Sequence, residues 1–372
     1  MKIAFLFSYK NSIESWKKAG ILERELEIFD ILNKKYGFHY TFVTYGTQND
    51  SKIVDRSYID IVPLKTSKKE IKLLNSFLFP FKLKNTLRNV DLIQQNQLPG
   101  VWVSIITSFL IKKPLFIRTG YDYLLFSKNQ NKNKLKVFVI KQITKYSLKF
   151  SSLYTVTSNE DYKFLTKNFQ FNNQKLKIRQ NWVISTKNPY QKEFLQSKIL
   201  CVGRLAEQKN YEYLLNSFKN IRKISIDIVG TGEKLEVLQK LSIENNISVN
   251  FLGKMENSEL KKLYSKYEIF ISTSTYEGNP KNILEAMGAG CIVIASDIPN
   301  HKEIIEDKIN GILFNLEKDN LSEIYFNIAK NEELKASIKQ NSLEYITKNN
   351  NIELIAELIN QDLKELTNSD YK

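Results

Sequence analysis

The stretch of sequence that decides the fold covers residues 269–296 and reads IFISTSTYEGNPKNILEAMGAGCIVIAS. An apolar run, a polar loop, an amphipathic segment and a second apolar run follow one another, which predicts a strand, a helix and another strand of a parallel sheet. Asn279 is a good N-cap residue, and Pro280 suits the first helical position because its missing N–H costs nothing there. We therefore expect a helix that begins at Pro280, whose free N–H groups and partial positive charge form an anion site.

The same alternation of short apolar runs and amphipathic stretches extends over the whole chain. The apolar runs are KIAFLF, HYTFVTY, YIDIVPL, DLIQQN, PLFIR and LYTVT in the first half, and ILCVG, ISIDIVG, VNFLG, IFIST and CIVIAS in the second. Strands that alternate with helices form parallel sheets covered by helices on both faces. Two such series in succession predict an α/β protein with two Rossmann-like domains, and 372 residues are enough for both.

Two carboxylates, Glu277 and Glu285, lie eight positions apart within this first stretch. Glu277 precedes the expected helix and Glu285 lies about one and a half turns inside it. One carboxylate would then reach a group beyond the helix mouth and the other a group beside it. A nucleotide sugar has this layout, with hydroxyls on its sugar and its ribose and a diphosphate between them. The alternative is an ordinary α/β segment with two solvated glutamates.

A second motif starts at Ile199 and reads ILCVGRLAEQKNYEYLLNSF. Gly203 allows a tight turn at the carboxyl end of a strand, where ligands bind in open α/β sheets. Arg204 and Lys209 then place two cations beside the same crevice as the helix at Pro280. In a chain this basic, the alternative is a pair of ordinary surface cations.

These two segments resemble the paired-glutamate signature of the retaining GT-B glycosyltransferases of family 4, the glycosyl transferases of group 1, of the bacterial surface-glycan type. The resemblance covers residues 270–314 and the motif after Ile199. It implies that Arg204 and Lys209 hold a donor diphosphate and, with Glu277 on the donor sugar, form the catalytic centre. It further implies that the donor is bound by Glu285 at the ribose and by Gly203, Gly278, Asn279, Pro280, Lys281, Gly232 and Lys254.

The resemblance also implies the architecture, in which two doubly wound Rossmann-like domains face each other across a cleft and a C-terminal helix crosses back to the first domain. On this chain it implies an acceptor-binding domain at 1–185, a linker at 186–197, a donor-binding domain at 198–349 and the returning helix at 350–372. No Asp-x-Asp sequence occurs, in agreement with the metal-independent chemistry of the family. We expect no metal and no cofactor, and a UDP- or GDP-linked donor as substrate.

The first half departs from the family pattern at two places. Where the family has a glycine pair after its first strand, this chain has Ala19 and Gly20, and Gly20 suits either an acceptor contact or an ordinary turn into a helix. After the strand PLFIR many members carry a histidine beside the donor sugar, whereas this chain reads RTGYDYLLF. Arg118, Tyr121 and Asp122 are the candidates for the missing function on the acceptor side.

The charge is concentrated in the first half of the chain. Residues 1–190 contain 32 Lys and Arg and 13 Asp and Glu, a net charge of +19, whereas residues 191–372 contain 23 and 27, a net charge of −4. Such asymmetry indicates an anionic partner for the first half. Residues 65–88 and 132–150 combine lysines with apolar side chains, as peripheral membrane segments do. Domain helices with one solvated face are the alternative for both stretches.

No apolar run approaches the roughly 18 residues that span a bilayer, and MKIAFLF is too short for a signal peptide. We therefore expect a cytoplasmic protein at the inner face of the membrane. The predicted function is transfer of a hexose-type sugar from a nucleotide sugar to a growing, lipid-linked glycan of a bacterial surface polysaccharide or glycoprotein. A nucleotide-sugar epimerase of GT-B architecture is the alternative enzyme. A basic nucleic-acid- or membrane-binding protein without catalysis is the alternative outside enzymes, although no nucleic-acid-binding motif occurs.

Overall fold

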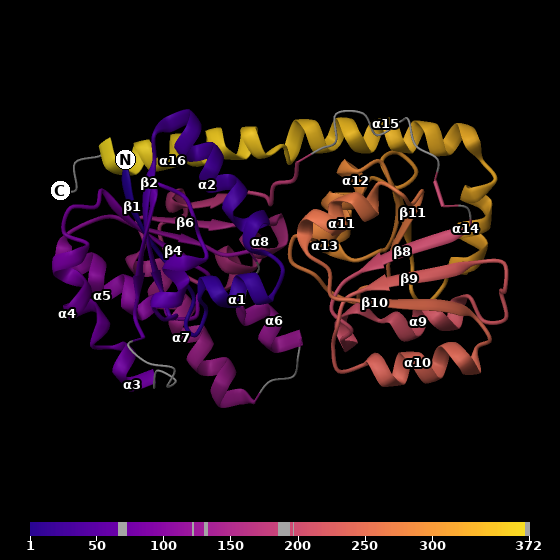
Figure 1. Cartoon of the computed structure of the whole chain (residues 1–372), viewed down its shortest axis with the longest axis horizontal. Coiled ribbons are helices and arrows are strands. Elements are labelled where there is room, and N and C mark those ends of the chain that lie inside the picture. The colour runs from indigo at the N-terminus through magenta and orange to yellow at the C-terminus, as the bar shows by residue number, and fades with distance from the viewer. Residues whose placement is uncertain (66–72, 121–122, 130–132, 185–193, 196, 369–372) are drawn as a thin grey trace. The chain divides into compact units, whose positions relative to one another are not determined.

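The computed structural model describes residues 1–65, 73–120, 123–129, 133–184, 194–195 and 197–368. The chain divides into two compact units (Figure 1). Unit 1 is Met1–Arg179 together with Ile355–Lys372, and unit 2 is Gln180–Leu354. Each unit is a parallel sheet with helices on both faces, which confirms the predicted α/β class.

Unit 1 contains a seven-stranded sheet in the order β3-β2-β1-β4-β5-β6-β7. Neighbouring strands are parallel throughout, and the order reverses at β1 and β4, as in a doubly wound fold. The strands are β1 (Lys2–Leu6), β2 (His39–Thr44), β3 (Ile59–Pro63), β4 (Leu92–Asn96), β5 (Leu115–Arg118), β6 (Leu153–Val156) and β7 (Leu176–Ile178). The helices are α1 (Ile13–Lys18), α2 (Leu22–Tyr36), α3 (Leu73–Ser76), α4 (Phe79–Thr86), α5 (Val101–Ile111), α6 (Tyr123–Asn129), α7 (Lys134–Phe150) and α8 (Asn159–Asn168).

Unit 2 contains a six-stranded parallel sheet in the order β10-β9-β8-β11-β12-β13. Its strands are β8 (Lys198–Val202), β9 (Ser225–Val229), β10 (Ser248–Gly253), β11 (Ile269–Ser272), β12 (Ile292–Ser296) and β13 (Ile312–Phe314). Its helices are α9 (Tyr211–Ser217), α10 (Leu235–Glu244), α11 (Asn257–Tyr264), α12 (Lys281–Gly288), α13 (Pro299–Lys302), α14 (Leu321–Ala329) and α15 (Glu332–Asn349). The strand order reverses between β8 and β11, so the carboxyl ends of these two neighbours flank the position where open sheets bind ligands.

The last helix, α16 (Ile352–Asn368), belongs to unit 1 from Ile355 onward, as expected for a helix that returns to the first domain. Asp362, whose side chain is 3% exposed, holds it there. The carboxylate accepts hydrogen bonds from Arg179 Nε at 2.6 Å and Nη2 at 2.7 Å, and from Lys177 Nζ at 2.8 Å. A bidentate pair of arginine and carboxylate fixes the relative orientation of the two side chains and also contributes binding energy. None of the helices in the described part of the chain is long and apolar enough to cross a membrane.

The boundary between the two units falls between Arg179 and Gln180, ahead of the expected end of the first domain at 185. The boundary falls early because Asn181 and Val183 bond to residues of unit 2. The side-chain amide of Asn181 donates to Asn279 O at 2.8 Å, and the backbone N–H of Val183 donates to Asn350 O at 2.9 Å. Both partners lie in unit 2, so this segment is attached there. Most of the expected linker, 186–197, lies outside the described residues.

Candidate active site

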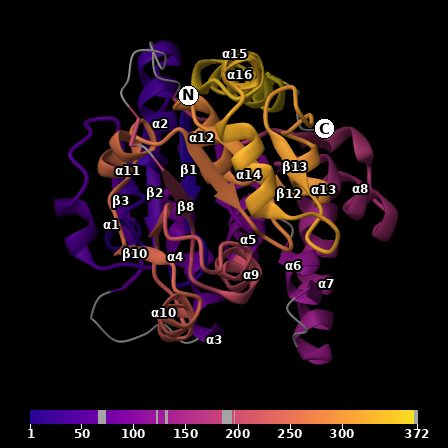
Figure 2. The same ribbon diagram turned by 90° about the vertical axis from the view of Figure 1, so that its right-hand side faces the viewer.

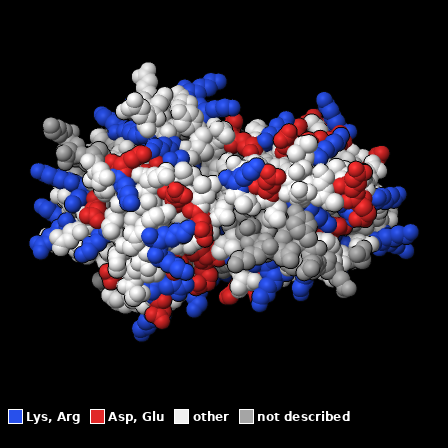
Figure 3. Space-filling view, turned by 90° about the horizontal axis from the view of Figure 1, so that it is seen from above, with Lys and Arg blue, Asp and Glu red and all other residues white. Residues whose placement is uncertain are grey.

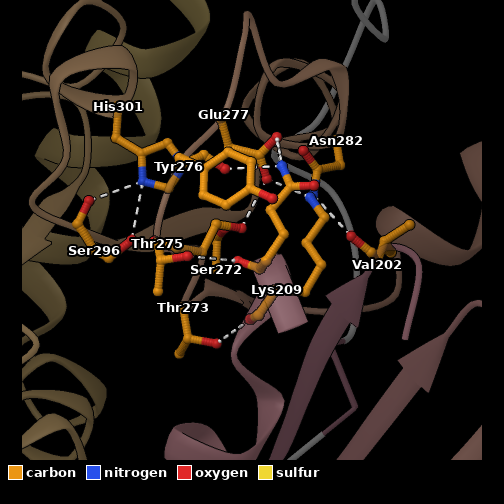
Figure 4. A network of polar contacts seen from close by, with 12 residues as sticks. Val202, Lys209, Ser272, Thr273, Thr275, Tyr276, Glu277, Asn282, Ser296 and His301 are labelled. Carbon is orange, nitrogen blue, oxygen red and sulfur yellow. Dashed lines mark hydrogen bonds and ion pairs between the residues drawn. The ribbon is translucent and has the colours of Figure 1, made fainter. Parts of the chain in front are cut away.

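The candidate site lies where the chain leaves β8 and β11 at the carboxyl edge of the second sheet (Figure 4). Lys209 ends a short turn, Glu207–Lys209, after β8, and Glu277 lies in the loop after β11. Backbone and hydroxyl contacts hold the two loops together. The N–H of Thr275 donates to Gln208 O at 2.9 Å, and Thr273 Oγ1 donates to Lys209 O at 2.8 Å. The pairing of two adjacent strands therefore brings together residues that are far apart in the sequence.

Lys209 and Glu277 form a buried ion pair at the centre of this site. The Nζ and Oε1 atoms lie 2.5 Å apart, and the two side chains are 14% and 10% exposed. The carboxylate also accepts hydrogen bonds from Ser274 Oγ at 2.7 Å and Gln208 Nε2 at 3.1 Å. Burial by itself would raise the pKa of Glu277, but Lys209 and the hydrogen bond from Ser274 outweigh it and hold this pKa below its usual value. Glu277 is therefore ionised at neutral pH.

The glycines of the site make room for other groups. A Cβ on Gly203 would lie 2.8 Å from Lys209 Cε, so the lysine reaches Glu277 by passing over the bare backbone. Gly230 has φ +146°, and a Cβ there would lie 1.9 Å from Gly203 O. At Gly232 it would lie 2.2 Å from Leu205 O. The loop after β9 thus packs directly on the backbone of the loop after β8, a closeness that only glycine permits.

The helix α12 begins one residue later than expected, and its cap differs from the prediction. Pro280 is the N-cap residue and Lys281 opens the helix. Asn279 does not cap, because its side-chain oxygen accepts the backbone N–H of Asn181 at 3.2 Å. The Lys281 ammonium lies 4.5 Å from the ring centroid of Trp182, a cation–π contact. The predicted N-cap role of Asn279 is therefore wrong, since it ties the helix mouth to the segment that enters unit 2.

The remaining donor-side candidates lie around this pair. Glu285, half-buried on α12, accepts a hydrogen bond from the Tyr264 hydroxyl at 3.3 Å. Arg204 is exposed in the loop directly after Gly203, and Lys254 is exposed directly after β10. Gly278 is buried in the loop before α12. The structure thus brings Gly203, Lys209 and Glu277 into one network and leaves Arg204 and Lys254 on the surface of the same unit.

His301, on α13 after β12, is a part of the network that the sequence did not reveal. Its side chain is fully buried, and Nδ1 lies 2.8 Å from Ser296 O. Figure 4 shows His301 beside Ser296. Ser296 Oγ donates to Ser274 O at 2.5 Å, and Ser274 Oγ in turn donates to Glu277. Burial lowers the pKa of His301 to about 4, although the nearby Glu277 carboxylate opposes this, so the ring is neutral at neutral pH. The sequence contained one signal for His301, its position, because α13 follows β12, a strand that ends at the same edge of the sheet.

The acceptor-side candidates belong to unit 1. Gly20 adopts φ +70°, and its N–H bonds Lys17 O at 2.9 Å while the next N–H bonds Trp16 O, so the residue closes α1 as a turn glycine does. Arg118, at the end of β5, is 9% exposed, and Nη1 donates to Arg179 O at 3.5 Å. Burial lowers the pKa of Arg118 to about 10. Tyr121 and Asp122 lie outside the described residues.

Known proteins resemble this chain in sequence and in fold. The family model described as "Glycosyl transferases group 1" matches residues 185–345. The O-antigen biosynthesis glycosyltransferase WbnH of Escherichia coli is 31% identical over 255 residues, which make up 68% of this chain and 71% of that protein. A GtfA subunit of a UDP-N-acetylglucosamine–peptide N-acetylglucosaminyltransferase from Streptococcus agalactiae is 32% identical over 120 residues, 31% of this chain and 24% of its own length.

Solved structures agree on the architecture. HepE of Anabaena in complex with UDP matches with a TM-score of 0.77 at 16% identity, over 98% of this chain and 100% of that chain. Sucrose-phosphate synthase of Thermosynechococcus elongatus matches with a TM-score of 0.79 at 16% identity, over 98% and 99%. The fold is thus that of the GT-B glycosyltransferases, and the matches favour glycosyl transfer over the epimerase alternative. With two thirds of its length aligned to an enzyme that shares nearly a third of the aligned residues, the chain belongs to the glycosyl transferases of group 1.

Proposed function

We propose that this glycosyltransferase is a retaining enzyme of family 4 that moves a hexose from a UDP- or GDP-sugar to a growing glycan. The observation that carries the proposal is the buried ion pair of Lys209 and Glu277 at the carboxyl edge of the second sheet. A buried cation whose counter-ion belongs to a neighbouring loop is a site where an anionic ligand can replace the carboxylate. HepE, a structural neighbour, has been solved with UDP and with UDP-glucose, which supports the choice of donor.

The donor diphosphate would replace Glu277 as the partner of Lys209. Its ammonium would exchange Glu277 for a phosphate oxygen, Arg204 would approach from the surface, and the first N–H groups of α12 would face the same charge. Fixed cations and dipoles aimed at a leaving group stabilise the charge that develops on it, and such groups often supply the largest part of catalysis. On this proposal the protein itself neutralises the leaving diphosphate, and neither a metal nor a cofactor takes part.

Glu277 and Glu285 would hold the two ends of the donor. Once Lys209 has turned to the phosphate, the Glu277 carboxylate can accept hydroxyl groups of the sugar, still oriented by Ser274 and Gln208. Glu285, at the side of α12, would accept ribose hydroxyls. In the chemical step the bond from the anomeric carbon to the phosphate oxygen breaks, and the acceptor oxygen bonds to that carbon on the same face. The acceptor proton passes to the leaving phosphate, so the anomeric configuration is retained.

The acceptor side belongs to the basic first half. We assign a lipid-linked, anionic glycan as acceptor, at the cytoplasmic face of the membrane, because residues 1–190 carry a net charge of +19. The name of the E. coli relative places that protein in O-antigen biosynthesis, which agrees with surface-glycan assembly. A nucleic acid is the less suitable anion, since the chain shows no motif that reads one.

Donor binding tests the proposal first. Thermal unfolding of the purified protein is measured with UDP-, GDP- and ADP-sugars, beside the variant Glu285→Ala and the matched control Glu236→Ala on α10. A ligand at 100 times its dissociation constant adds about 2.7 kcal/mol to the stability of the folded state. We expect one nucleotide class to stabilise the wild type and the control but not Glu285→Ala. Absence of stabilisation by every nucleotide sugar would reject the donor site.

Turnover then tests the chemistry. Arg204→Ala should bind the donor but lower kcat, because the exposed guanidinium acts mainly on charge that develops during transfer. The anomeric configuration of the product, read by NMR, distinguishes retention from inversion. An inverted product would refute the retaining mechanism, and conversion of the donor sugar without an acceptor would support the epimerase instead.

A further inference from the structure

The helix α7 of unit 1 has two apolar faces, and only one of them is buried. Ile140 and Leu148, 4% and 1% exposed, face the domain core, where Val137 and Ile143 pack beside them. A surface helix of this kind normally carries polar residues on the opposite side. In α7 the opposite side is apolar as well.

Five large apolar side chains form the exposed face. They recur three, four or seven positions apart and therefore share one stripe of the helix. These are Leu135 at 70% exposure, Phe138 at 59%, Val139 at 47%, Tyr146 at 48% and Phe150 at 36%. Phe109 of α5, itself 60% exposed, extends the stripe, because its ring centroid lies 5.3 Å from that of Phe150. We call these six residues and the lysines of α7 the α7 surface.

Lysines border the stripe. Lys134, Lys141, Lys145 and Lys149 follow one edge and Lys136 lies at the other, and α7 contains no carboxylate. Between Asp91 and Glu160 the sequence has ten Lys and Arg and a single carboxylate residue, Asp122. Among the described residues, none of the five α7 lysines forms an ion pair. The face of unit 1 that carries α2 and α16 is different, because cations and carboxylates are interspersed there (Figure 3).

A second group of exposed apolar residues occurs in unit 1. In α3, α4 and the turn between them the side chains of Leu74, Leu78 and Phe81 are 80%, 59% and 63% exposed. Both Figure 1 and Figure 2 show α3 and the first turns of α7 reaching the lower side of the unit. Lys82 and Lys84 of α4 add positive charge to this group. The combination of exposed aromatic residues and lysines is thus repeated on this side.

We propose that the α7 surface docks on an anionic phospholipid bilayer. Aromatic and aliphatic side chains can enter the boundary between headgroups and acyl chains while the bordering lysines meet phosphate and other anionic headgroups. A second copy of the chain fits less well, because a two-fold contact would set the lysines of one α7 against those of the other. A polyanion such as nucleic acid would satisfy the lysines but leave the apolar stripe in water. The proposal goes beyond the transfer reaction and does not depend on the donor site.

Vesicle sedimentation of the full chain tests the proposal. One set of vesicles is phosphatidylcholine alone, and the other contains phosphatidylglycerol in addition. The variant Phe138→Ser with Val139→Ser removes part of the stripe, and Lys141→Gln with Lys145→Gln removes part of the border. The matched controls are in unit 2. Val237→Ser with Ile243→Ser, 47% and 80% exposed in the wild type, lies on α10. Lys219→Gln, just after α9, is combined with Lys240→Gln on α10. Because every substituted side chain is exposed, the variants should keep the wild-type unfolding temperature.

We expect the wild type and both controls to sediment with the anionic vesicles and to be released at high salt. Since a cation near such a surface contributes about 1 kcal/mol, loss of two lysines should weaken partitioning roughly 30-fold. Loss of Phe138 and Val139 should weaken it at least about tenfold. Equal binding of the α7 variants and the wild type would overturn the proposal, as would equal binding to neutral vesicles. A dimer that Phe138→Ser with Val139→Ser dissociates would assign the surface to a second copy instead.

Discussion

Substitution of Lys209 by methionine should destabilise unit 2 by about 3 kcal/mol at neutral pH. Methionine keeps much of the length of the chain that passes over Gly203 but removes the charge 2.5 Å from the Glu277 carboxylate. Removal of one partner from a buried ion pair costs about 3–5 kcal/mol, because the other charge is left without compensation. We take the lower value, since Ser274 and Gln208 still donate hydrogen bonds to Glu277.

The loss of stability caused by Lys209→Met should depend on pH, and the direction of this dependence can be stated. In the wild type the folded-state pKa of Glu277 lies below its ordinary value, so its stabilisation is present above pH about 4.3 and is lost as the pH falls through the folded-state pKa. In the Lys209→Met variant burial dominates and should raise that pKa, so the variant loses stability as the pH rises above about 4.3. The difference in stability between the wild type and the Lys209→Met variant is therefore largest at neutral pH and becomes smaller in acid.

Thermal unfolding at about pH 7 and about pH 5 measures this difference. For a unit of this size, 3 kcal/mol corresponds to a decrease of roughly 6–12 °C in Tm. Lys234→Met is the matched control, because Lys234 pairs with Glu207 and Glu212, whose side chains are 85% and 43% exposed. It should keep a Tm close to that of the wild type. An equal loss in both variants, or a Lys209→Met loss that does not change with pH, would refute the reasoning.

Three other substitutions test separate parts of the fold and the site. Asp362→Ala should lower the stability of unit 1 by about 3 kcal/mol, because it removes the carboxylate partner of the partly buried Arg179 and leaves Lys177 with Glu365 alone. Glu365→Ala should change this stability by less than about 1 kcal/mol, because the Glu365 side chain is 68% exposed. Denaturant unfolding compares the two variants. Gly232→Ala would place a Cβ 2.2 Å from a backbone oxygen, so nucleotide-dependent thermal stabilisation should disappear, and a wild-type response would contradict this. Ser274→Ala removes a hydrogen bond to Glu277 and should raise the KM for the donor several-fold, as steady-state kinetics would show; an unchanged KM would remove Ser274 from the site.

Much of the fold could be predicted from the sequence because its strands are short, apolar and regularly spaced. The apolar runs correspond to strands in both sheets, but β7 and β13 were not predicted. Each of these has three residues and lies at the edge of its sheet with one neighbour. Three residues are too few to show a periodic apolar pattern that distinguishes a strand from a loop. These strands form because the rest of the sheet offers hydrogen-bonding groups along its edge.

In the candidate site, too, the sequence identified some residues, and only the structure showed how they contact one another. Glu277 and Lys209 could be identified by sequence alone, because each follows an apolar run at the end where parallel strands bind ligands. Their direct contact, the use of Asn279 to bond Asn181 and the link from His301 through Ser296 follow from tertiary structure alone. Periodicity and turn residues are local properties that a sequence records. Which loops meet depends on strand order and register, which the packing of the whole unit decides.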